Sequence, residues 1–180
     1  SFEAVSAAAR AEDPEVEIAL QETQMGTGHA VDQARAALGD FDGTVIVLYG
    51  DCPLIQSRTL EELNASLSDS AVSVLGFEAK DPARYGRLIT DGDKLKRIVE
   101  FKDASPAERA VTLCNSGVMA APADLLFDLL SEIDANNASG ELYLTDVIGK
   151  AVARGLPCTA VRCAERETLG VNSRVELMQA

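Results

Sequence analysis

The sequence predicts an α/β fold in which helices cover one mixed sheet and a β-hairpin is inserted into that sheet. First, residues 44–49 form an apolar, largely β-branched run that ends in Gly50-Asp51 and is stopped by Pro53, which is typical of a buried parallel strand. Second, strand-like and helix-like segments alternate over residues 16–77. Third, Asp91-Gly92-Asp93-Lys94 separates two apolar runs, which indicates a tight hairpin.

The first half of the chain is expected to alternate helices with parallel strands. The expected elements are a helix over 1–10, a strand over 16–20, a polar turn over 21–28, a helix over 29–38, the strand over 44–49 and a helix over 57–67. In the helix over 29–38, Val31, Ala34 and Leu38 share one face and Gly39 is the stop signal. This order of elements implies right-handed crossovers between parallel strands.

The second half is expected to add antiparallel pairing to this layer. Ser105-Pro106-Ala107-Glu108 has the residues of a capping box, with proline in the first helical turn. The expected elements are a strand over 71–77, hairpin strands over 86–90 and 95–100, a short helix after Ser105, a strand over 111–120, a helix over 122–133, a helix over 144–153, a strand over 159–162 and a helix over 173–178. Because no repeat or linker interrupts the pattern, we expect one domain over residues 1–180.

Composition and charge narrow the class of partner. The chain has 180 residues, is 47% hydrophobic and carries a formal charge of −13, so it can bury a core but presents an acidic surface. An acidic surface argues against nucleic acid and against an anionic membrane, whereas a small nucleotide can still bind where local donors allow it. No stretch reaches the roughly 20 apolar residues of a membrane span, so we expect a cytoplasmic protein.

Cysteine and histidine give little support for metal or nucleophile chemistry. The four cysteines, Cys52, Cys114, Cys158 and Cys163, form no C-x-x-C pair, and we expect reduced thiols that are mostly buried. The sequence has no G-x-S-x-G elbow and no G-x-x-x-x-G-K-[ST] loop. The single histidine, His29, is expected to cap or pack a helix start.

Gly26-Thr27-Gly28 suggests a site that binds a dinucleotide. A G-x-G after a strand and before a helix is half of a dinucleotide-binding fingerprint, and Asp51 ends the next strand, where it could hold a ribose. Val31 replaces the third glycine of that fingerprint. A plain turn that uses glycine for a positive φ explains the same residues, so both interpretations stay open.

Polar side chains at predicted strand ends and turns form a second candidate set. Its members are Asp51, Glu100, Gln21, Asn115 and Asn172. Each of them alone could be an ordinary cap or a solvated group. If they converge, they offer oxygen ligands for a hard cation and hydrogen bonds for a sugar or a base.

Several segments together resemble a known family. They are Gln21–Ala30, Leu48–Leu54, Tyr85-Gly86-Arg87, Ile98–Ala104, Asn115-Ser116-Gly117, Gly140–Asp146 and Gly170–Arg174. In this order and spacing they are similar to the bacterial N-acetylglucosamine-1-phosphate uridylyltransferases, the pyrophosphorylase half of a bifunctional enzyme that makes UDP-N-acetylglucosamine for peptidoglycan and lipopolysaccharide. The resemblance covers nearly the whole chain and implies a Rossmann-like nucleotidyltransferase (GT-A-like) fold.

The resemblance also implies a role for each matching residue. Gln21, Gly26 and Thr27 match positions that hold uracil, Tyr49, Gly50 and Asp51 match the turn at the nucleotide phosphates, Gly86, Glu100 and Asn115 match the sugar pocket, and Asp51 and Asn172 match two magnesium ligands. Two protein ligands need phosphate oxygens to complete the shell of Mg²⁺. The implied reaction is an in-line attack of N-acetylglucosamine 1-phosphate on the α-phosphorus of UTP, without a protein nucleophile.

The sequence departs from the family pattern in several places. Nothing before Gln21 matches the family's first strand and glycine-rich loop with its Arg and Lys, and no left-handed β-helix with acetyltransferase activity follows. Phe101, Leu142 and Ser116 stand where His, Tyr and Thr are usual. Because the chain begins with Ser1, we expect a fragment, and because the family's triphosphate loop is missing, we expect it to be inactive alone. The resemblance implies a homotrimeric parent, and we expect the fragment to be a monomer. The alternatives are another sugar-phosphate nucleotidyltransferase and a non-catalytic nucleotide- or dinucleotide-binding module.

Overall fold

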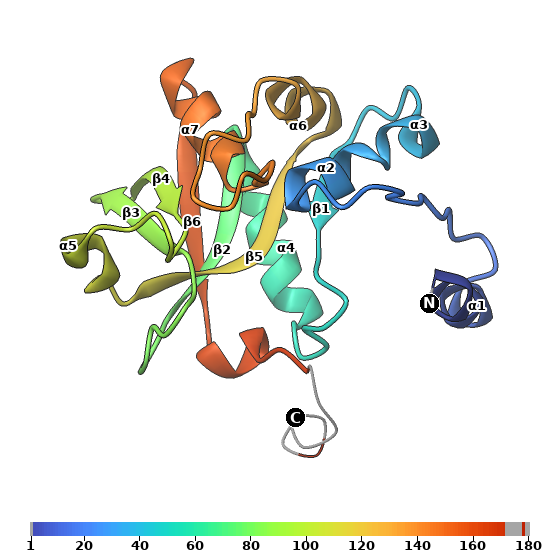
Figure 1. Cartoon of the computed structure of the whole chain (residues 1–180), viewed down its shortest axis with the longest axis horizontal. Coiled ribbons are helices and arrows are strands. Elements are labelled where there is room, and N and C mark those ends of the chain that lie inside the picture. Colours follow the sequence, from blue (N-terminus) through green and yellow to red (C-terminus); the bar gives the residue numbers. More distant parts are fainter. Residues whose placement is uncertain (1, 172–177, 179–180) are drawn as a thin grey trace.

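A mixed sheet forms the centre of the computed structural model, which describes residues 2–171 and 178 (Figure 1). Its strands are β1 (Thr44–Val47), β2 (Val72–Glu78), β3 (Arg87–Asp91), β4 (Lys94–Val99), β5 (Leu113–Pro122) and β6 (Cys158–Cys163). They lie in the order β1-β5-β2-β6-β4-β3. Strands β2 and β6 are parallel and the other paired strands are antiparallel. The predicted α/β class with a mixed sheet is confirmed.

Strand β1 corrects one prediction. The apolar run at 44–49 was expected to be a buried parallel strand, but β1 pairs antiparallel with β5, with Val45 opposite Ala121. The run is apolar because both faces of the strand are covered: Ile46 packs on one side of the sheet, and Val45 and Val47 on the other. An apolar run records this burial on two faces but carries no information about the direction of the partner strand.

The predicted hairpin is confirmed and is inserted between other strands. Strands β3 and β4 pair antiparallel, and Gly92 takes a φ of 59° in the turn. At one end Arg87 of β3 also pairs with Cys114 of β5, and at the other Lys94 of β4 pairs with Thr159 of β6. These two pairings join both ends of the hairpin to the rest of the sheet, so that the hairpin lies beside β5.

Helices cover both faces of the sheet. Helices α6 (Ala123–Leu130) and α7 (Asp146–Ala153) pack on one face, and α4 (Ser57–Ala65), which continues into a 3₁₀ turn over Ser66–Ser68, packs on the other. Alternate residues of β2 serve the two faces, because Val74 packs with the α6 and α7 side and Leu75 with the α4 side. The remaining helices are α1 (Phe2–Glu12), α2 (Thr27–Asp32), α3 (Arg35–Leu38), α5 (Pro106–Arg109) and a 3₁₀ turn over Glu165–Thr168.

The N-terminal segment differs most from the sequence prediction. Residues 16–20 are extended but form no strand, and Leu20 is 48% exposed. The helix expected over 29–38 is divided into α2 and α3, because Gln33 and Ala34 donate their backbone N–H groups to residues three positions back, Ala30 and Val31. Figure 1 shows α1 at the end of the extended segment, away from the sheet.

Two shorter signals, one at a helix start and one at a helix end, are confirmed. Ser105 and Glu108 form the predicted capping box at α5, with Pro106 in the first turn, and Gly39 ends α3 with a φ of 52°. Apart from Met178, the helix predicted over 173–178 lies outside the described residues. Within the described part of the chain, no helix has the length and hydrophobicity needed to cross a membrane.

Candidate active site

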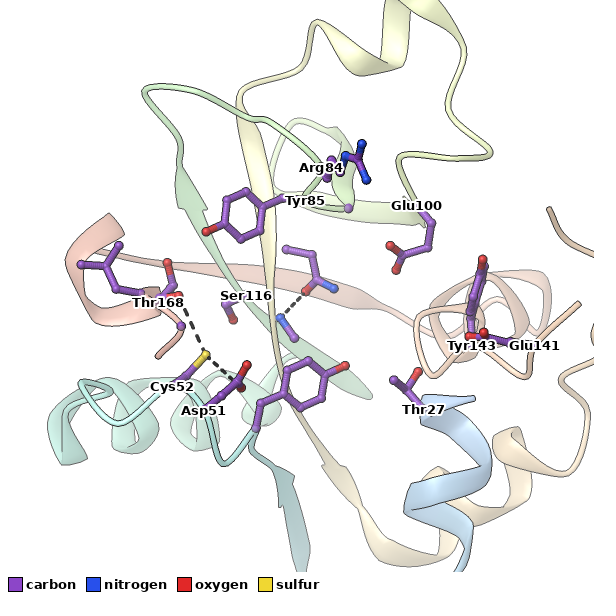
Figure 2. A pocket seen from close by; sticks show the side chains of 16 residues that line it. Thr27, Asp51, Cys52, Arg84, Tyr85, Glu100, Ser116, Glu141, Tyr143 and Thr168 are labelled. Atoms are coloured by element: carbon purple, nitrogen blue, oxygen red, sulfur yellow. Dashed lines mark hydrogen bonds between the residues drawn. The ribbon is translucent and has the colours of Figure 1, made fainter. Parts of the chain in front are cut away.

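A cavity of about 580 Å³ opens where β5 changes its neighbour along one edge. Strand β1 pairs with residues 119–122 of β5, and β3 pairs with it at Cys114. The segment between these two contacts is free to face a ligand. The residues that line the cavity are Thr27, Tyr49, Asp51, Cys52, Arg84, Tyr85, Gly86, Glu100, Asn115, Ser116, Gly117, Glu141, Tyr143, Thr168, Leu169 and Gly170 (Figure 2).

An irregularity in β5 shapes the floor of the cavity. Met119 pairs with Val74 and Asn115 with Gly76, so the three residues between them on β5 lie opposite Leu75 alone. The Ser116 hydroxyl donates to the Leu75 carbonyl at 2.7 Å, and Asn115 Oδ1 accepts from the Gly117 N–H at 3.0 Å. These two hydrogen bonds hold the Asn115-Ser116-Gly117 motif where it bulges out of the strand.

Tyr49 lies against this bulge. A β-carbon added to Gly117 would lie 2.8 Å from Cδ2 of the Tyr49 ring, and Gly117 has a φ of 89°. Both the space and the backbone conformation therefore require glycine. Burial raises the pKa of the Tyr49 hydroxyl, and the charge of Glu100 raises it further.

Asp51 marks one end of the cavity, in the turn that follows β1. Its backbone carbonyl accepts from the Val171 N–H at 2.7 Å. Cys52 Sγ lies 3.7 Å from Asp51 Oδ1 and 3.9 Å from the Thr168 carbonyl, and burial, followed by the charge of Asp51, raises the pKa of this thiol. The Asp51 turn is thus attached to the segment 168–171. Asn172, the other expected magnesium ligand, lies outside the described residues.

Glu100 marks another side of the cavity. Its Oε1 accepts from the Thr145 hydroxyl at 3.1 Å. Burial raises the pKa of Glu100, the hydrogen bond from Thr145 opposes this shift, and the charges of Asp146 and Asp103 add to it. Figure 2 shows that Asp51 and Glu100 approach the cavity from different sides.

Gly86 connects the Glu100 side to β5. Its carbonyl accepts from the Asn115 N–H at 2.8 Å. A β-carbon on Gly86 would lie 3.4 Å from both carboxylate oxygens of Glu100, which is an ordinary contact. Space in this structure therefore does not by itself require glycine at position 86. Gly86, Glu100 and Asn115, three expected sugar contacts, are nevertheless brought together.

The loop before α2 is attached to the segment around Leu142. Gly26, with a φ of 118°, packs so closely that an added β-carbon would lie 2.5 Å from the Leu142 carbonyl oxygen. Leu142 donates its N–H to the Met25 carbonyl and accepts from the Gly28 N–H. Thr27 accepts from the Leu144 N–H at 3.0 Å and lines the cavity. Gly26 therefore serves close backbone packing, and Thr27 faces the site.

Gln21 does not line the cavity. Its Nε2 donates to the Gly26 carbonyl at 3.0 Å and lies 3.0 Å from His29 Nδ1. Gln21 and His29 thus hold each other at the start of α2, which fits the packing role expected for the histidine. The dinucleotide interpretation loses support here, because residues 2–25 form no strand and the strand before Asp51 is antiparallel.

Several residues that line the cavity have no role predicted from the sequence. They are Cys52, Arg84, Tyr85, Ser116, Gly117, Glu141, Tyr143, Thr168, Leu169 and Gly170. Tyr85 is fixed by an edge-to-face contact with Phe77, with 5.0 Å between the ring centroids. Some of these residues belong to the segments that carried the family resemblance, Tyr85-Gly86-Arg87 and Gly140–Asp146, and this signal could have found them.

The charges of the cavity bear on metal binding. Its lining includes three carboxylates, Asp51, Glu100 and Glu141, and one guanidinium, that of Arg84. Among the described residues, no three His, Cys, Asp or Glu side chains group closely enough to hold a metal ion. An Asp51 carboxylate that faces the cavity is nevertheless a suitable oxygen donor for Mg²⁺ when phosphate oxygens supply further ligands. The residues therefore fit a cation that arrives with a phosphorylated ligand.

Known proteins resemble this chain over nearly its whole length. Residues 2–165 match the protein-family model described as "Nucleotidyl transferase". The chain is 57% identical over 178 residues to the "Bifunctional protein GlmU" of Ruegeria sp. (strain TM1040), covering 99% of this chain and 40% of that protein. It is 60% identical over 165 residues to the protein of the same name from Maricaulis maris (strain MCS10), covering 90% of this chain and 36% of that protein. The chain thus spans about two fifths of the length of these curated relatives.

Solved structures show the same fold at low sequence identity. A putative glucose-1-phosphate thymidylyltransferase from Bacillus anthracis has a TM-score of 0.70 and 20% identity, covering 98% of this chain and 69% of that chain. A nucleoside-diphosphate-sugar pyrophosphorylase from Vibrio cholerae has a TM-score of 0.66 and 14% identity, covering 98% of this chain and 75% of that chain.

Proposed function

The chain belongs to the nucleotidyl transferase family. We propose that it is the uridylyltransferase part of a longer bifunctional protein, because its curated relatives are bifunctional proteins of greater length. The reaction transfers a uridylyl group from UTP to N-acetylglucosamine 1-phosphate and releases pyrophosphate. One observation carries the proposal: Thr27, Tyr49, Asp51, Gly86, Glu100 and Asn115, which come from distant parts of the chain, line a single cavity. These are residues for which the resemblance implies contact with a sugar nucleotide.

The sugar is proposed to bind beside Glu100. The Glu100 carboxylate and the Asn115 side chain offer an acceptor and an amide for sugar hydroxyls, while the backbone of Gly86 is open to close approach. Thr145 already donates to Glu100 Oε1, which helps to hold the carboxylate toward the cavity. Sugar recognition in this proposal therefore depends on a carboxylate that stays ionised.

The uracil is proposed to bind near the start of α2. Thr27 lines the cavity and is the candidate for direct contact, the backbone at Gly26 precedes it, and Gln21 supports this loop through its hydrogen bond to the Gly26 carbonyl. A rigid loop of this kind can match the imide edge of uracil, because an unmatched buried donor or acceptor costs about 1–3 kcal/mol. Discrimination between bases would arise from this cost.

Asp51 and Asn172 are proposed to hold Mg²⁺ together with phosphate oxygens of the substrates. The ion would neutralise negative charge on the phosphates during transfer. The hydrogen bond between the Val171 N–H and the Asp51 carbonyl supports the pairing, since it joins the turn that carries Asp51 to the residue that precedes Asn172 in sequence. Asp51 then orients a phosphate, and Tyr49 and the Gly117 backbone exclude water beside it.

The chemistry needs no protein nucleophile. The 1-phosphate of the sugar attacks the α-phosphorus of UTP, the bond to the bridging oxygen breaks, and pyrophosphate leaves. The transfer step is accelerated by the positioning of the two substrates' phosphates and by compensation of their negative charge. We further propose that the whole protein is cytoplasmic and homotrimeric.

Pyrophosphate release tests the proposed function. The full-length protein is expected to release pyrophosphate from UTP only when both Mg²⁺ and N-acetylglucosamine 1-phosphate are present. If turnover is faster with another sugar 1-phosphate or another nucleoside triphosphate than with N-acetylglucosamine 1-phosphate and UTP, the protein is a different sugar-phosphate nucleotidyltransferase. Calorimetry that detects binding of NAD but not of UDP-N-acetylglucosamine would favour the non-catalytic dinucleotide module.

A further inference from the structure

Arg87 is a fully buried cation beside the candidate active site. It begins β3, and only 2% of its surface is exposed. None of the ion pairs found among residues 2–171 includes it. A buried guanidinium is costly unless its donors are satisfied, so the groups that it does bind indicate what it is for.

The guanidinium of Arg87 binds backbone carbonyls on two separate segments. It donates to the carbonyls of Tyr85 and Ala83, the latter from Nη2 at 3.2 Å. It also donates to the Arg109 carbonyl, from Nε at 3.4 Å and from Nη2 at 3.3 Å. Ala83 has a φ of 37°, which is uncommon for a residue with a side chain. Arg87 thus stabilises an unfavourable turn and joins it to the end of α5.

The first of these segments carries residues of the proposed sugar pocket, and the second contacts the residue that follows Glu100. The first segment supplies Arg84, Tyr85 and Gly86 to the cavity lining. The second reaches Glu100 through its neighbour, because Arg109 Nε donates to the Phe101 carbonyl at 3.2 Å and its guanidinium stacks on the Phe101 ring at 4.4 Å. The Arg87 guanidinium lies over the same ring at 5.9 Å. Arg87 therefore contacts the segment that contains Gly86 and, through Phe101 and Arg109, the segment that contains Glu100.

We propose that Arg87 is a positioning residue that holds Gly86 and Glu100 in place and so determines recognition of the sugar phosphate. This inference rests on the proposed function. Only arginine fits the task, because its planar fork presents donors in several directions at once, whereas lysine is a single point charge on a flexible stem. Arg87 touches neither the cavity nor the reacting atoms, so its effect passes through the two segments.

Arg87→Lys in the full-length protein tests the proposal, with Arg97→Lys as the matched control. Arg97 lies on the adjacent strand β4, is exposed, and pairs with Glu108. For Arg87→Lys we expect KM for N-acetylglucosamine 1-phosphate to rise about tenfold, the equivalent of one lost or misplaced hydrogen bond. KM for UTP and kcat should stay within about twofold, since the Asp51 side of the cavity is not altered. The control should change none of the three constants.

A merely structural role would give a different result. General destabilisation would lower the melting temperature and the amount of active enzyme but leave the KM for each substrate at its wild-type value. That outcome would overturn the proposal. If Arg87→Lys does not fold, Phe101→Leu decides instead, because it removes the ring that lies near both guanidiniums and leaves the charge of Arg87 in place. A rise in KM for the sugar phosphate alone supports the proposal, and unchanged KM values reject it. Should the unmodified protein show no uridylyl transfer, the proposed function itself would be wrong.

Discussion

The ring of Tyr49 packs directly over the α-carbon of Gly117, where no β-carbon would fit. Gly117→Ala is therefore expected to push the ring away and also to strain a backbone at a φ of 89°. Because both effects add, we expect the free energy of unfolding to fall by about 2–4 kcal/mol. Urea denaturation measures this change.

Gly155→Ala serves as the matched control for that substitution. Gly155 has a φ of 75° but open space around its α-carbon, so alanine there costs only the backbone strain, about 1 kcal/mol. In a Tyr49→Ala background, Gly117→Ala should cost no more than this control. An equal cost of Gly117→Ala with and without the Tyr49 ring would contradict the packing argument.

Asp51 is predicted to be essential for turnover. Asp51→Asn keeps the size of the side chain but removes the charge that would hold Mg²⁺, so we expect kcat of the full-length protein to fall by at least about 100-fold. Asp69→Asn, an exposed aspartate that follows the 3₁₀ turn over Ser66–Ser68, is the control and should leave kcat unchanged. Pyrophosphate release at saturating substrate measures both variants, and wild-type turnover in Asp51→Asn would refute the assignment.

Glu100 is predicted to make sugar binding sensitive to acid. Burial raises its pKa, so it takes up a proton at a higher pH than an exposed glutamate does. KM for N-acetylglucosamine 1-phosphate should therefore begin to rise, as the pH falls, while exposed carboxylates are still ionised. Glu100→Gln should show a higher KM with little dependence on pH in this range. A wild-type profile that is as flat as that of Glu100→Gln would reject the role of its charge.

The same pKa shift has a consequence for stability with a definite sign. Because the folded pKa lies above the unfolded one, the native state binds more protons than the unfolded state between the two values. The contribution of Glu100 to the free energy of unfolding should thus fall as pH rises through this window. Chemical denaturation at several pH values should show that Glu100→Gln gains stability relative to wild type on the alkaline side. No relative gain would mean that burial does not raise this pKa.

Glu167 is predicted to anchor the wall that contains Thr168, Leu169 and Gly170. Its buried carboxylate accepts from the Thr59 hydroxyl at 2.6 Å, at the start of α4. Thr59→Val leaves this carboxylate without the hydroxyl, which should lower the free energy of unfolding by about 1–3 kcal/mol. Ser68→Ala, which removes an exposed hydroxyl, should change it by less than about 0.5 kcal/mol. If urea denaturation shows that Thr59→Val and Ser68→Ala lower the free energy of unfolding by similar amounts, the anchoring role is disproved.

Elements whose signals lie within a few residues were predictable from the sequence. The turn at Gly92, the capping box of Ser105 and Glu108 and the helix stop at Gly39 all formed as expected. In each case the interacting atoms belong to neighbouring residues. Their geometry follows from local backbone preferences, and distant contacts change it little.

Pairing between distant segments was not predictable in the same way. Residues 16–20 have an apolar, strand-like composition but form no strand, and the run at 44–49 pairs antiparallel. Hydrophobic pattern reports how a segment is buried, whereas the identity and direction of its partner depend on residues far away in sequence. The predicted helix is also divided at Gln33 and Ala34, where two backbone hydrogen bonds reach three positions back, and the hydrophobic pattern does not show this division.

The amino-acid sequence was sufficient to predict the α/β class and to name candidate site residues, because composition and motifs belong to single segments. Which of these residues come together depends on how the whole chain folds. Folding brought Tyr49, Glu100 and Asn115 to one cavity beside the bulge in β5, and it turned Gln21 toward His29 instead. The physical reason is that the cavity exists only where β5 passes from β1 to β3, and that exchange of partners is a long-range event.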